Sequence, residues 1–342
     1  MGEDLSAAPA LTAVTPELIM QLGTSFMATR HLIAASEVGV FEALADAALD
    51  LDALAARIAV PRRTARICTD AMVALGLLER DGSLYRNSPV AAAFLSGRGR
   101  GDLRPFLRYL DVSYGAWAEF TGAIRTGQGS GFITRLDPDT QRVFSAGVES
   151  ATASSAAALA DSYEFGQHRR LLDLGGGTGS FLVRILGRYP AIECGLFELP
   201  HVVAMARENL AAQVPGRRVR YYEGDLLRDQ LPTGYDAFLL ANVIHVFTPA
   251  HNRGLLERVH ASALPGARLL LVDFWTNPTH TQPVFAALMA GEWLMGRGEG
   301  DVYSEDEICD LLTATGWTMT ARRPLAGPAS LVVAERNSRE SS

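Results

Sequence analysis

A glycine run in the second half of the chain is the first feature whose residue types suggest chemistry. Residues 175–179 read Gly-Gly-Gly-Thr-Gly, and they follow two leucines and an acid, Asp173. An apolar, helix-prone segment comes directly after them. This order predicts a buried strand, a tight turn and a helix, which is the opening of a nucleotide-binding βαβ unit. Glycines without a Cβ atom let the backbone turn sharply and let a ligand approach the main chain.

Two acids follow at the ends of the next two expected strands. Glu198 lies about 20 residues beyond Gly179, the separation at which an acid accepts hydrogen bonds from a ribose diol. Asp225 ends the third expected strand, where a carboxylate can contact an adenine amine. Either acid alone could be a solvated loop carboxylate. Because both end consecutive strands after the glycine turn, the sequence predicts an adenine nucleoside as the ligand.

The residues around the turn favour a cationic ligand over a dinucleotide. The run does not match the dinucleotide pattern G-x-G-x-x-G, since Ser180 stands where the last glycine is required. Asp173, two residues before the first glycine, would repel a pyrophosphate and attract an ammonium or a sulfonium group. These observations favour S-adenosylmethionine over NAD or FAD.

His245 is the candidate for proton transfer. It follows the expected strand 236–240, at the same end of the sheet as the two acids. Near neutral pH an imidazole can take the proton of a phenol or an enol while that group attacks a methyl donor. A structural histidine is the alternative interpretation. The histidines show no metal-ligand spacing, so we expect no metal. A metal site that pairs His245 with His280 is the alternative.

Composition excludes several other kinds of protein. The net charge of −7 argues against nucleic acid as the main partner, because phosphate binding needs a basic surface. All 31 basic residues are arginine, which excludes Schiff-base chemistry and a P-loop lysine. The three cysteines are isolated, as expected in a reducing cytoplasm. No apolar run is long enough to span a membrane, and no signal peptide is visible.

The elements that would position these residues divide the chain into parts. Residues 15–102 predict helices followed by a hairpin around Asp81-Gly82, a winged-helix layout. This module could be structural, or it could bind DNA through Arg62, Arg63 and Arg66. Residues 103–165 predict connecting helices that cover a substrate, and residues 166–337 alternate strand and helix. That alternation predicts an α/β domain with a Rossmann-like, doubly wound, mostly parallel sheet. Disordered tails are expected at 1–14 and 338–342.

Four segments carry a resemblance to a known family. In order they are LLDLGGGTGSF, FELPHVV, YYEGDLL and ANVIHVFTPAHNRGLLERV. They resemble the class I S-adenosylmethionine-dependent O-methyltransferases. The nearest group contains plant caffeic acid and acetylserotonin O-methyltransferases and bacterial polyketide and antibiotic tailoring enzymes. The resemblance covers nearly the whole chain, and it implies that the winged-helix part is a dimerisation domain and the protein a homodimer.

The resemblance also implies roles for individual residues. His245 would be the general base, and Asp273 would orient it. Gly175 and Gly177 would hold the methionine part of the cofactor, and Glu198 would bind the ribose. Asp225 and Leu226 would flank the adenine. The full expected cofactor site is Asp173, Gly175, Gly177, Glu198, Leu199, Asp225, Leu226 and Phe247.

This chain departs from the family pattern around the proposed base. The family segment usually reads H-D-W, and Val246 and Phe247 replace its acid and tryptophan. The family lysine four residues before the histidine is Ala241 here. At the position where the family has a second acid that supports the histidine, this chain has Val302, although Glu299 and Asp301 lie close by in the sequence. These departures remove one cofactor contact and two carboxylates from the expected site.

The resulting prediction is a cytoplasmic, homodimeric O-methyltransferase that acts on a hydroxyl of an aromatic or polyketide-like molecule and releases S-adenosylhomocysteine. Rival functions are C-methylation on the same scaffold, a pericyclic or hydroxylation step, and a small-molecule-responsive DNA-binding regulator. No membrane or nucleic-acid partner is expected. The residues predicted to line an apolar substrate pocket are Phe106, Trp117, Phe144, Met289 and Trp293.

Overall fold

The computed structural model describes residues 15–99 and 101–337, so the two predicted tails lie outside the described residues. The chain divides into two compact units. The first contains the described residues up to Tyr114 together with Asp139–Ala151, and the second contains Gly115–Pro138 and the described residues from Thr152 onward. Residues 103–165, which we expected to form one connecting part, are therefore shared between the two units.

The first unit has the predicted helices and hairpin. Helix α1 (Pro16–Glu37) begins at Thr15, whose hydroxyl accepts a hydrogen bond from the Leu18 N–H. Three strands form a small antiparallel sheet in the order β1-β3-β2, and the hairpin turns at the predicted Asp-Gly pair. The other elements of this unit are α2 (Val40–Ala43), β1 (Leu49–Asp50), α3 (Leu51–Arg57), α4 (Arg62–Ala74), β2 (Leu78–Asp81), β3 (Leu84–Asn87) and α5 (Pro89–Phe94).

Helices α6 (Arg104–Trp117) and α8 (Pro138–Ser162) each contribute residues to both units. Helix α7 (Phe120–Thr126) and the short 3₁₀ helix η1 (Phe132–Arg135) belong to the second. Among the described residues, no helix combines the length and the apolar character needed to cross a bilayer.

A seven-stranded sheet in the order β6-β5-β4-β7-β8-β10-β9 forms the centre of the second unit. Strands β4 to β8 pair in parallel, and β9 and β10 add an antiparallel edge. This confirms the predicted doubly wound, mostly parallel fold. The strands are β4 (Arg170–Leu174), β5 (Glu193–Glu198), β6 (Val219–Glu223), β7 (Tyr235–Ala241), β8 (Ala263–Asp273), β9 (Trp317–Pro324) and β10 (Ser330–Arg336).

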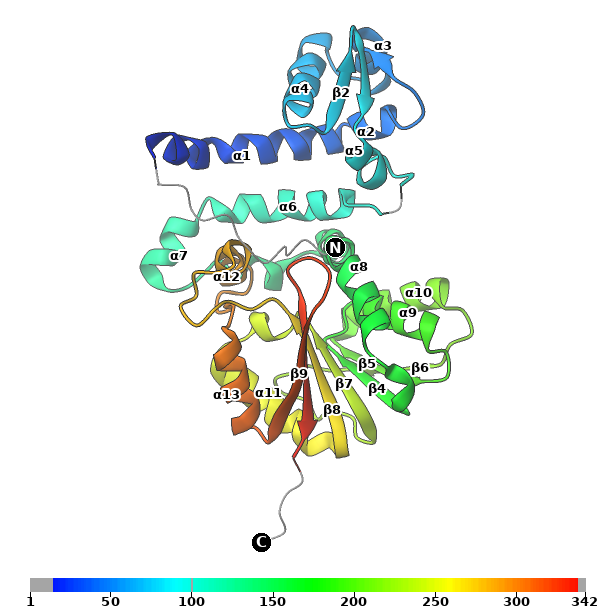
Figure 1. Ribbon diagram of the computed structural model, residues 1–342, viewed down its shortest axis with the longest axis vertical. Coiled ribbons are helices and arrows are strands. Elements are labelled where there is room, and N and C mark those ends of the chain that lie inside the picture. The colour runs from blue at the N-terminus through cyan, green and yellow to red at the C-terminus, as the bar shows by residue number, and fades with distance from the viewer. Residues whose placement is uncertain (1–14, 100, 338–342) are drawn as a thin grey trace, which may run out of the picture. The chain divides into compact units, whose positions relative to one another are not determined.

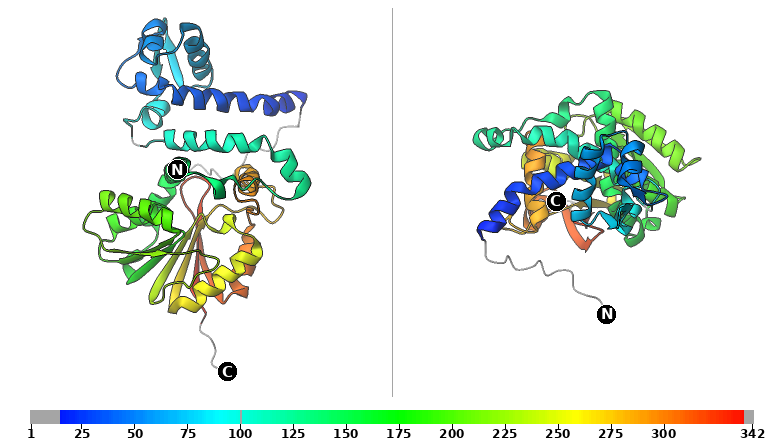
Figure 2. Two further views of the ribbon diagram at one scale, coloured as in Figure 1. Left: turned by 180° about the vertical axis from the view of Figure 1, so that it is seen from behind. Right: turned by 90° about the horizontal axis from the view of Figure 1, so that it is seen from above.

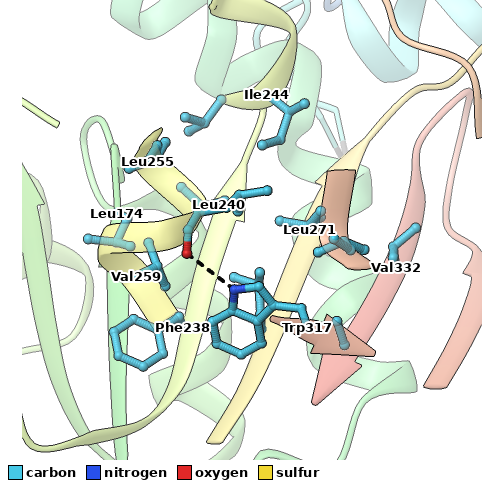
Figure 3. Close-up of a cluster of buried hydrophobic side chains, with 14 of the residues drawn as sticks. Leu174, Phe238, Leu240, Ile244, Leu255, Val259, Leu271, Trp317 and Val332 are labelled. Atoms are coloured by element: carbon cyan, nitrogen blue, oxygen red, sulfur yellow. Dashed lines mark hydrogen bonds between the residues drawn. The ribbon is translucent and has the colours of Figure 1, made fainter. Parts of the chain in front are cut away.

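Helices cover both faces of this sheet, as Figure 1 and the rear view in Figure 2 show. Because successive strand residues point to opposite faces, Leu239 packs with α8, α9 (Ser180–Arg188) and α10 (Pro200–Gln213), whereas Leu240 packs with α11 (Pro249–Ser262) and α13 (Glu305–Ala314). In the second cluster the fully buried Trp317 donates its indole N–H to the Leu256 carbonyl at 3.2 Å (Figure 3).

The sheet topology brings the predicted chemical residues to one edge. The chain leaves β4 toward β5 and β6 on one side, and then continues with β7 and β8 on the other. In such sheets ligands bind beyond the carboxyl ends of the strands, where this order reverses. The glycine turn, Glu198, Asp225, His245 and Asp273 all lie at or just beyond these ends.

Candidate active site

The glycine turn needs its glycines for two physical reasons. Gly175 and Gly177 have φ values of 70° and 54°, in the left-handed region that disfavours other residues. A Cβ atom on Gly175 would also lie 2.9 Å from Val243 Cγ2 and 3.2 Å from Leu226 Cδ1. Around a Cβ on Gly177, by contrast, no described atom lies within 4 Å. The turn therefore packs against Val243 on one side and leaves open space at Gly177.

Asp173 is a buried carboxylate to which the described part of the chain offers no hydrogen-bond donor. Its side chain is 1% exposed, and neither oxygen has a partner among the described residues. Burial, together with the charge of the nearby Glu198 carboxylate, raises its pKa to about 8. A cationic ligand group would relieve this desolvation and repulsion, so the site fits an ammonium or a sulfonium.

Glu198 ends β5 and is tied to the glycine turn. Its carboxylate accepts hydrogen bonds from the backbone N–H of Gly177 at 3.1 Å and of Leu199 at 2.8 Å. Burial raises the pKa of Glu198, while these two backbone bonds act in the opposite direction. A carboxylate has about four acceptor positions, so it can still accept hydrogen bonds from a ribose diol.

The other residues predicted to surround the cofactor lie close to this turn or to the histidine. Leu226 approaches Gly175, as described above, and Asp225 accepts a hydrogen bond from the Leu227 N–H at 2.8 Å. Phe247 is half-buried against the hydrophobic cluster that contains Ile244. These positions leave Asp225 partly exposed and able to bind a ligand amine.

His245 and Asp273 are brought together as predicted. His245 lies in the 3₁₀ helix η3 (Ile244–Val246) after β7, and Asp273 is the last residue of β8. The distance between His245 Nδ1 and Asp273 Oδ1 is 2.6 Å, and both side chains are almost fully buried. Since a carboxylate only accepts, Nδ1 donates this hydrogen bond, and in a neutral imidazole Nε2 would then carry the lone pair. Nε2 is buried and has no partner among the described residues.

Two aromatic rings stack on the imidazole. The Trp293 ring lies 3.9 Å from the His245 ring between centroids, at 22° between planes, and the Phe274 ring lies 5.1 Å away at 24°. Trp293 belongs to α12 (Val284–Arg297), a helix that the sequence analysis did not predict. Phe274 was not predicted as a site residue, because an apolar residue next to Asp273 looks like ordinary core.

The positions where the family carries extra acids are apolar and buried. Val246 is 9% exposed and Val302 is 1% exposed. Nearby Glu299 contacts His251 at 3.1 Å, and the Asp301 N–H donates to the His245 carbonyl at 3.0 Å. Among the described residues, Asp273 is therefore the carboxylate that forms a hydrogen bond with the His245 ring. His280, considered above as a metal-site partner, instead contacts Glu307 at 3.2 Å.

The five predicted pocket residues fall in different units. Phe106 and Phe144 lie in the first unit, where each contacts Tyr109, at 6.1 and 5.4 Å between ring centroids. Trp117, Met289 and Trp293 lie in the second unit. The Trp117 indole N–H donates to the buried Glu292 carboxylate at 2.6 Å.

Arg297 is a further residue that sequence reasoning missed. Burial lowers its pKa, whereas the charges of Glu198, Asp225 and Glu299 raise it, so the guanidinium lies within electrostatic range of both predicted cofactor acids. The sequence gives one indirect signal for it: because the chain has no lysine, a permanently cationic side chain beside these acids has to be an arginine. Arg297 also lines a cavity of about 600 Å³ together with Gly127, Gln128, Gly129, Pro249, Leu294, Gly298, Glu299, Gly300 and Asp301.

Comparisons with known proteins identify the family to which the chain is similar. Residues 123–318 match an O-methyltransferase domain, and residues 20–97 match an O-methyltransferase dimerisation domain. The tetracenomycin polyketide synthesis 8-O-methyl transferase TcmO of Streptomyces glaucescens is 30% identical, over 94% of this chain and 97% of that protein. The 3-hydroxy-5-methyl-1-naphthoate 3-O-methyltransferase of Streptomyces sahachiroi is 32% identical, over 92% of each.

A solved structure described as PigF with SAH has a TM-score of 0.87 and 27% identity, and the match covers 94% of this chain and 100% of that one. The family match extends over more than half of the sequence, and the buried acid and the glycine turn fit the cationic cofactor that the family uses. This chain belongs to the S-adenosylmethionine-dependent O-methyltransferase family.

Proposed function

We propose that this methyltransferase transfers a methyl group to a hydroxyl of an aromatic or polyketide-like small molecule, with His245 as the general base. The observation that carries the proposal is the buried His245–Asp273 pair, whose outer nitrogen has no partner among the described residues. Val243, two residues before the histidine, approaches the glycine turn. The short segment that carries the proposed base therefore packs against the proposed cofactor turn.

Asp173, Glu198 and Asp225 would hold the cofactor, with the glycine turn against its methionine part. When bound, the cofactor supplies an activated methyl group on a sulfonium sulfur. His245 Nε2 accepts the proton of the substrate hydroxyl as that oxygen attacks. Asp273 keeps the other nitrogen protonated, so the lone pair faces the substrate, and its negative charge stabilises the imidazolium that forms. The protein otherwise contributes alignment of the reacting groups.

The names of the two Streptomyces relatives support an aromatic acceptor. One name specifies an 8-O-methylation in polyketide synthesis, and the other specifies the 3-hydroxyl of a naphthoate. The dimerisation domain supports a homodimer, and the relatives' biosynthetic roles suit a cytoplasmic enzyme. We infer the same class of acceptor and the same assembly for this chain.

The test combines product analysis with one variant. Incubation with isotope-labelled S-adenosylmethionine and a panel of phenolic and naphthoic acceptors, followed by mass spectrometry and NMR, identifies the product and shows whether oxygen or carbon carries the label. We expect His245→Ala to reduce kcat about 10²- to 10⁴-fold while its affinity for S-adenosylhomocysteine stays unchanged. Full activity of this variant would reject His245 as the base, and a carbon-bound label would reject O-methylation.

A further inference from the structure

The Trp293 and Phe274 rings stack on the His245 imidazole, which becomes charged during the proposed reaction. Proton transfer turns the imidazole into a cation in a place where water is excluded, since the His245 side chain is 2% exposed. Burial disfavours a charged ring. By the family pattern two further carboxylates would stand nearby, and here the corresponding positions are the buried Val246 and Val302. In the described part of the chain, Asp273 is the carboxylate in hydrogen-bond contact with the ring.

Aromatic faces supply a different kind of support. The face of an indole or phenyl ring is electronegative and attracts a cation within about 6 Å of the ring centroid. Trp293 and Phe274, at 3.9 and 5.1 Å from the imidazole, both lie inside that range with nearly parallel planes. Indole is the strongest of the aromatic side chains in this interaction. The two rings also restrict rotation of the imidazole about its axis, which keeps Nδ1 directed at Asp273.

The local backbone is built to seat Trp293 in this position. A Cβ atom on Gly300 would lie 2.8 Å from both the His245 carbonyl oxygen and Trp293 Cβ. A larger residue at this position would therefore push the backbone of His245 away from Trp293. The preceding residue on α12, Glu292, is held by the Trp117 indole at 2.6 Å. Trp293 is itself only 8% exposed. The stack is therefore part of the packed interior of the second unit.

We propose that Trp293, together with Phe274, is a positioning residue that holds the His245 ring in its productive orientation and stabilises its protonated form. This inference rests on the proposed role of His245. It differs from the role predicted from the sequence, in which Trp293 forms a wall of the substrate pocket. A wall contributes to substrate binding, whereas a positioning residue contributes to the proton-transfer step.

The two roles give different results for Trp293→Leu and Trp293→Phe. We expect Trp293→Leu, which removes the ring, to reduce kcat about 3- to 30-fold with little change in KM. Trp293→Phe, which keeps an aromatic face but loses the indole N–H, should retain most of kcat. Phe274→Leu provides a second test, which removes the other stacked ring, and should also lower kcat. Trp317→Leu is the matched control, because it truncates a fully buried indole for which no ring contact with His245 is found among the described residues, and it should lower stability but preserve kcat.

NMR provides a measurement that does not depend on turnover. The short Nδ1–H hydrogen bond to Asp273 should give a low-field proton signal, which is assigned by its absence in His245→Ala. We expect the signal to broaden or disappear in Trp293→Leu and to persist in Trp293→Phe and Trp317→Leu. An unchanged signal in Trp293→Leu would overturn the proposal.

The kinetic outcomes are equally decisive. A rise in KM without a fall in kcat in Trp293→Leu would assign Trp293 to the substrate pocket and contradict the positioning role. Equal losses in Trp293→Phe and Trp293→Leu would assign the effect to the indole N–H instead of the stack. Full activity of His245→Ala would refute the proposed base, whereas a defective His245→Ala with fully active Trp293→Leu and Phe274→Leu would refute only the positioning role.

Discussion

Replacing Asp173 by asparagine should stabilise the cofactor-free protein and weaken cofactor binding. The carboxylate is 1% exposed, and no described residue donates a hydrogen bond to it. Burial raises its pKa from 3.8 to about 8, with Glu198 adding to the effect. In the folded state the group holds its proton up to about pH 8, whereas in the unfolded chain it loses the proton near pH 4. The folded protein therefore binds more protons in this window, and its stability falls as the pH rises.

The magnitude follows from the size of the shift. Each pKa unit corresponds to about 1.4 kcal/mol, so the whole shift corresponds to about 6 kcal/mol. Between pH 5 and pH 8.5 the destabilisation from this group should increase by about 4 kcal/mol. Asparagine is nearly isosteric and does not ionise. The stability of Asp173→Asn relative to the original protein should therefore grow by that amount over the same range, and should then level off above pH 8.

Urea unfolding without cofactor at pH 5 and pH 8.5 measures this difference. Asp236→Asn is the control, because the Asp236 carboxylate accepts hydrogen bonds from the backbone N–H groups of Arg169 and Arg170 at 2.9 and 2.8 Å. Removing that carboxylate should destabilise the protein at both pH values. If Asp173→Asn gains no stability over the original protein as the pH rises, ionisation of Asp173 does not destabilise the folded state and the reasoning fails.

The same group links cofactor binding to pH. A cationic ligand requires Asp173 to be ionised, so the affinity for S-adenosylhomocysteine should increase between pH 6 and pH 8, by at most about tenfold per pH unit. In Asp173→Asn the affinity should be lower and this dependence should disappear. Isothermal titration of both proteins at pH 6, 7 and 8 provides the test, and parallel pH profiles would contradict the assignment.

Two further predictions concern the same edge of the sheet. Glu198→Gln leaves one side-chain oxygen for two backbone N–H groups, so its affinity for S-adenosylhomocysteine, measured by titration, should fall about 10- to 100-fold, and unchanged affinity would reject Glu198 as a ligand. Gly175→Ala should abolish binding and destabilise the protein by about 1–3 kcal/mol in urea unfolding, because its Cβ would meet Val243 at 2.9 Å. Gly177→Ala has open space and should cost only about 1–2 kcal/mol of backbone strain, so equal defects in the two variants would contradict the steric argument.

Much of the second unit could be predicted because its signals are local. Strands β4, β5 and β7 contain short apolar runs and β8 ends in one, and Glu198, Asp225 and Asp273 stand at or just after strand ends in the sequence. A parallel sheet then brings those ends together. The pairing of His245 with Asp273 follows from the same geometry, although 28 residues separate them.

The surroundings of His245 could not be predicted in this way. Trp293 reaches the imidazole from α12, and no periodicity or spacing relates that helix to η3. Aromatic residues are common in cores, so Trp293 and Phe274 have no distinguishing signal until their ring contacts are known. The members of the predicted substrate pocket were chosen by residue type alone, and they are distributed over both units.

The charges at the cofactor site explain why the sequence favours a cation there. The Glu198 charge raises the pKa of Asp173, and the described guanidinium that lowers the pKa of Glu198 is that of Arg297. The family lysine is replaced by Ala241, so this edge of the sheet carries less positive charge than the family pattern provides. A pyrophosphate would add to the excess negative charge, whereas a sulfonium and an ammonium would neutralise it. We therefore propose that the carboxylate expected to destabilise the cofactor-free protein is also the group that favours a cationic cofactor.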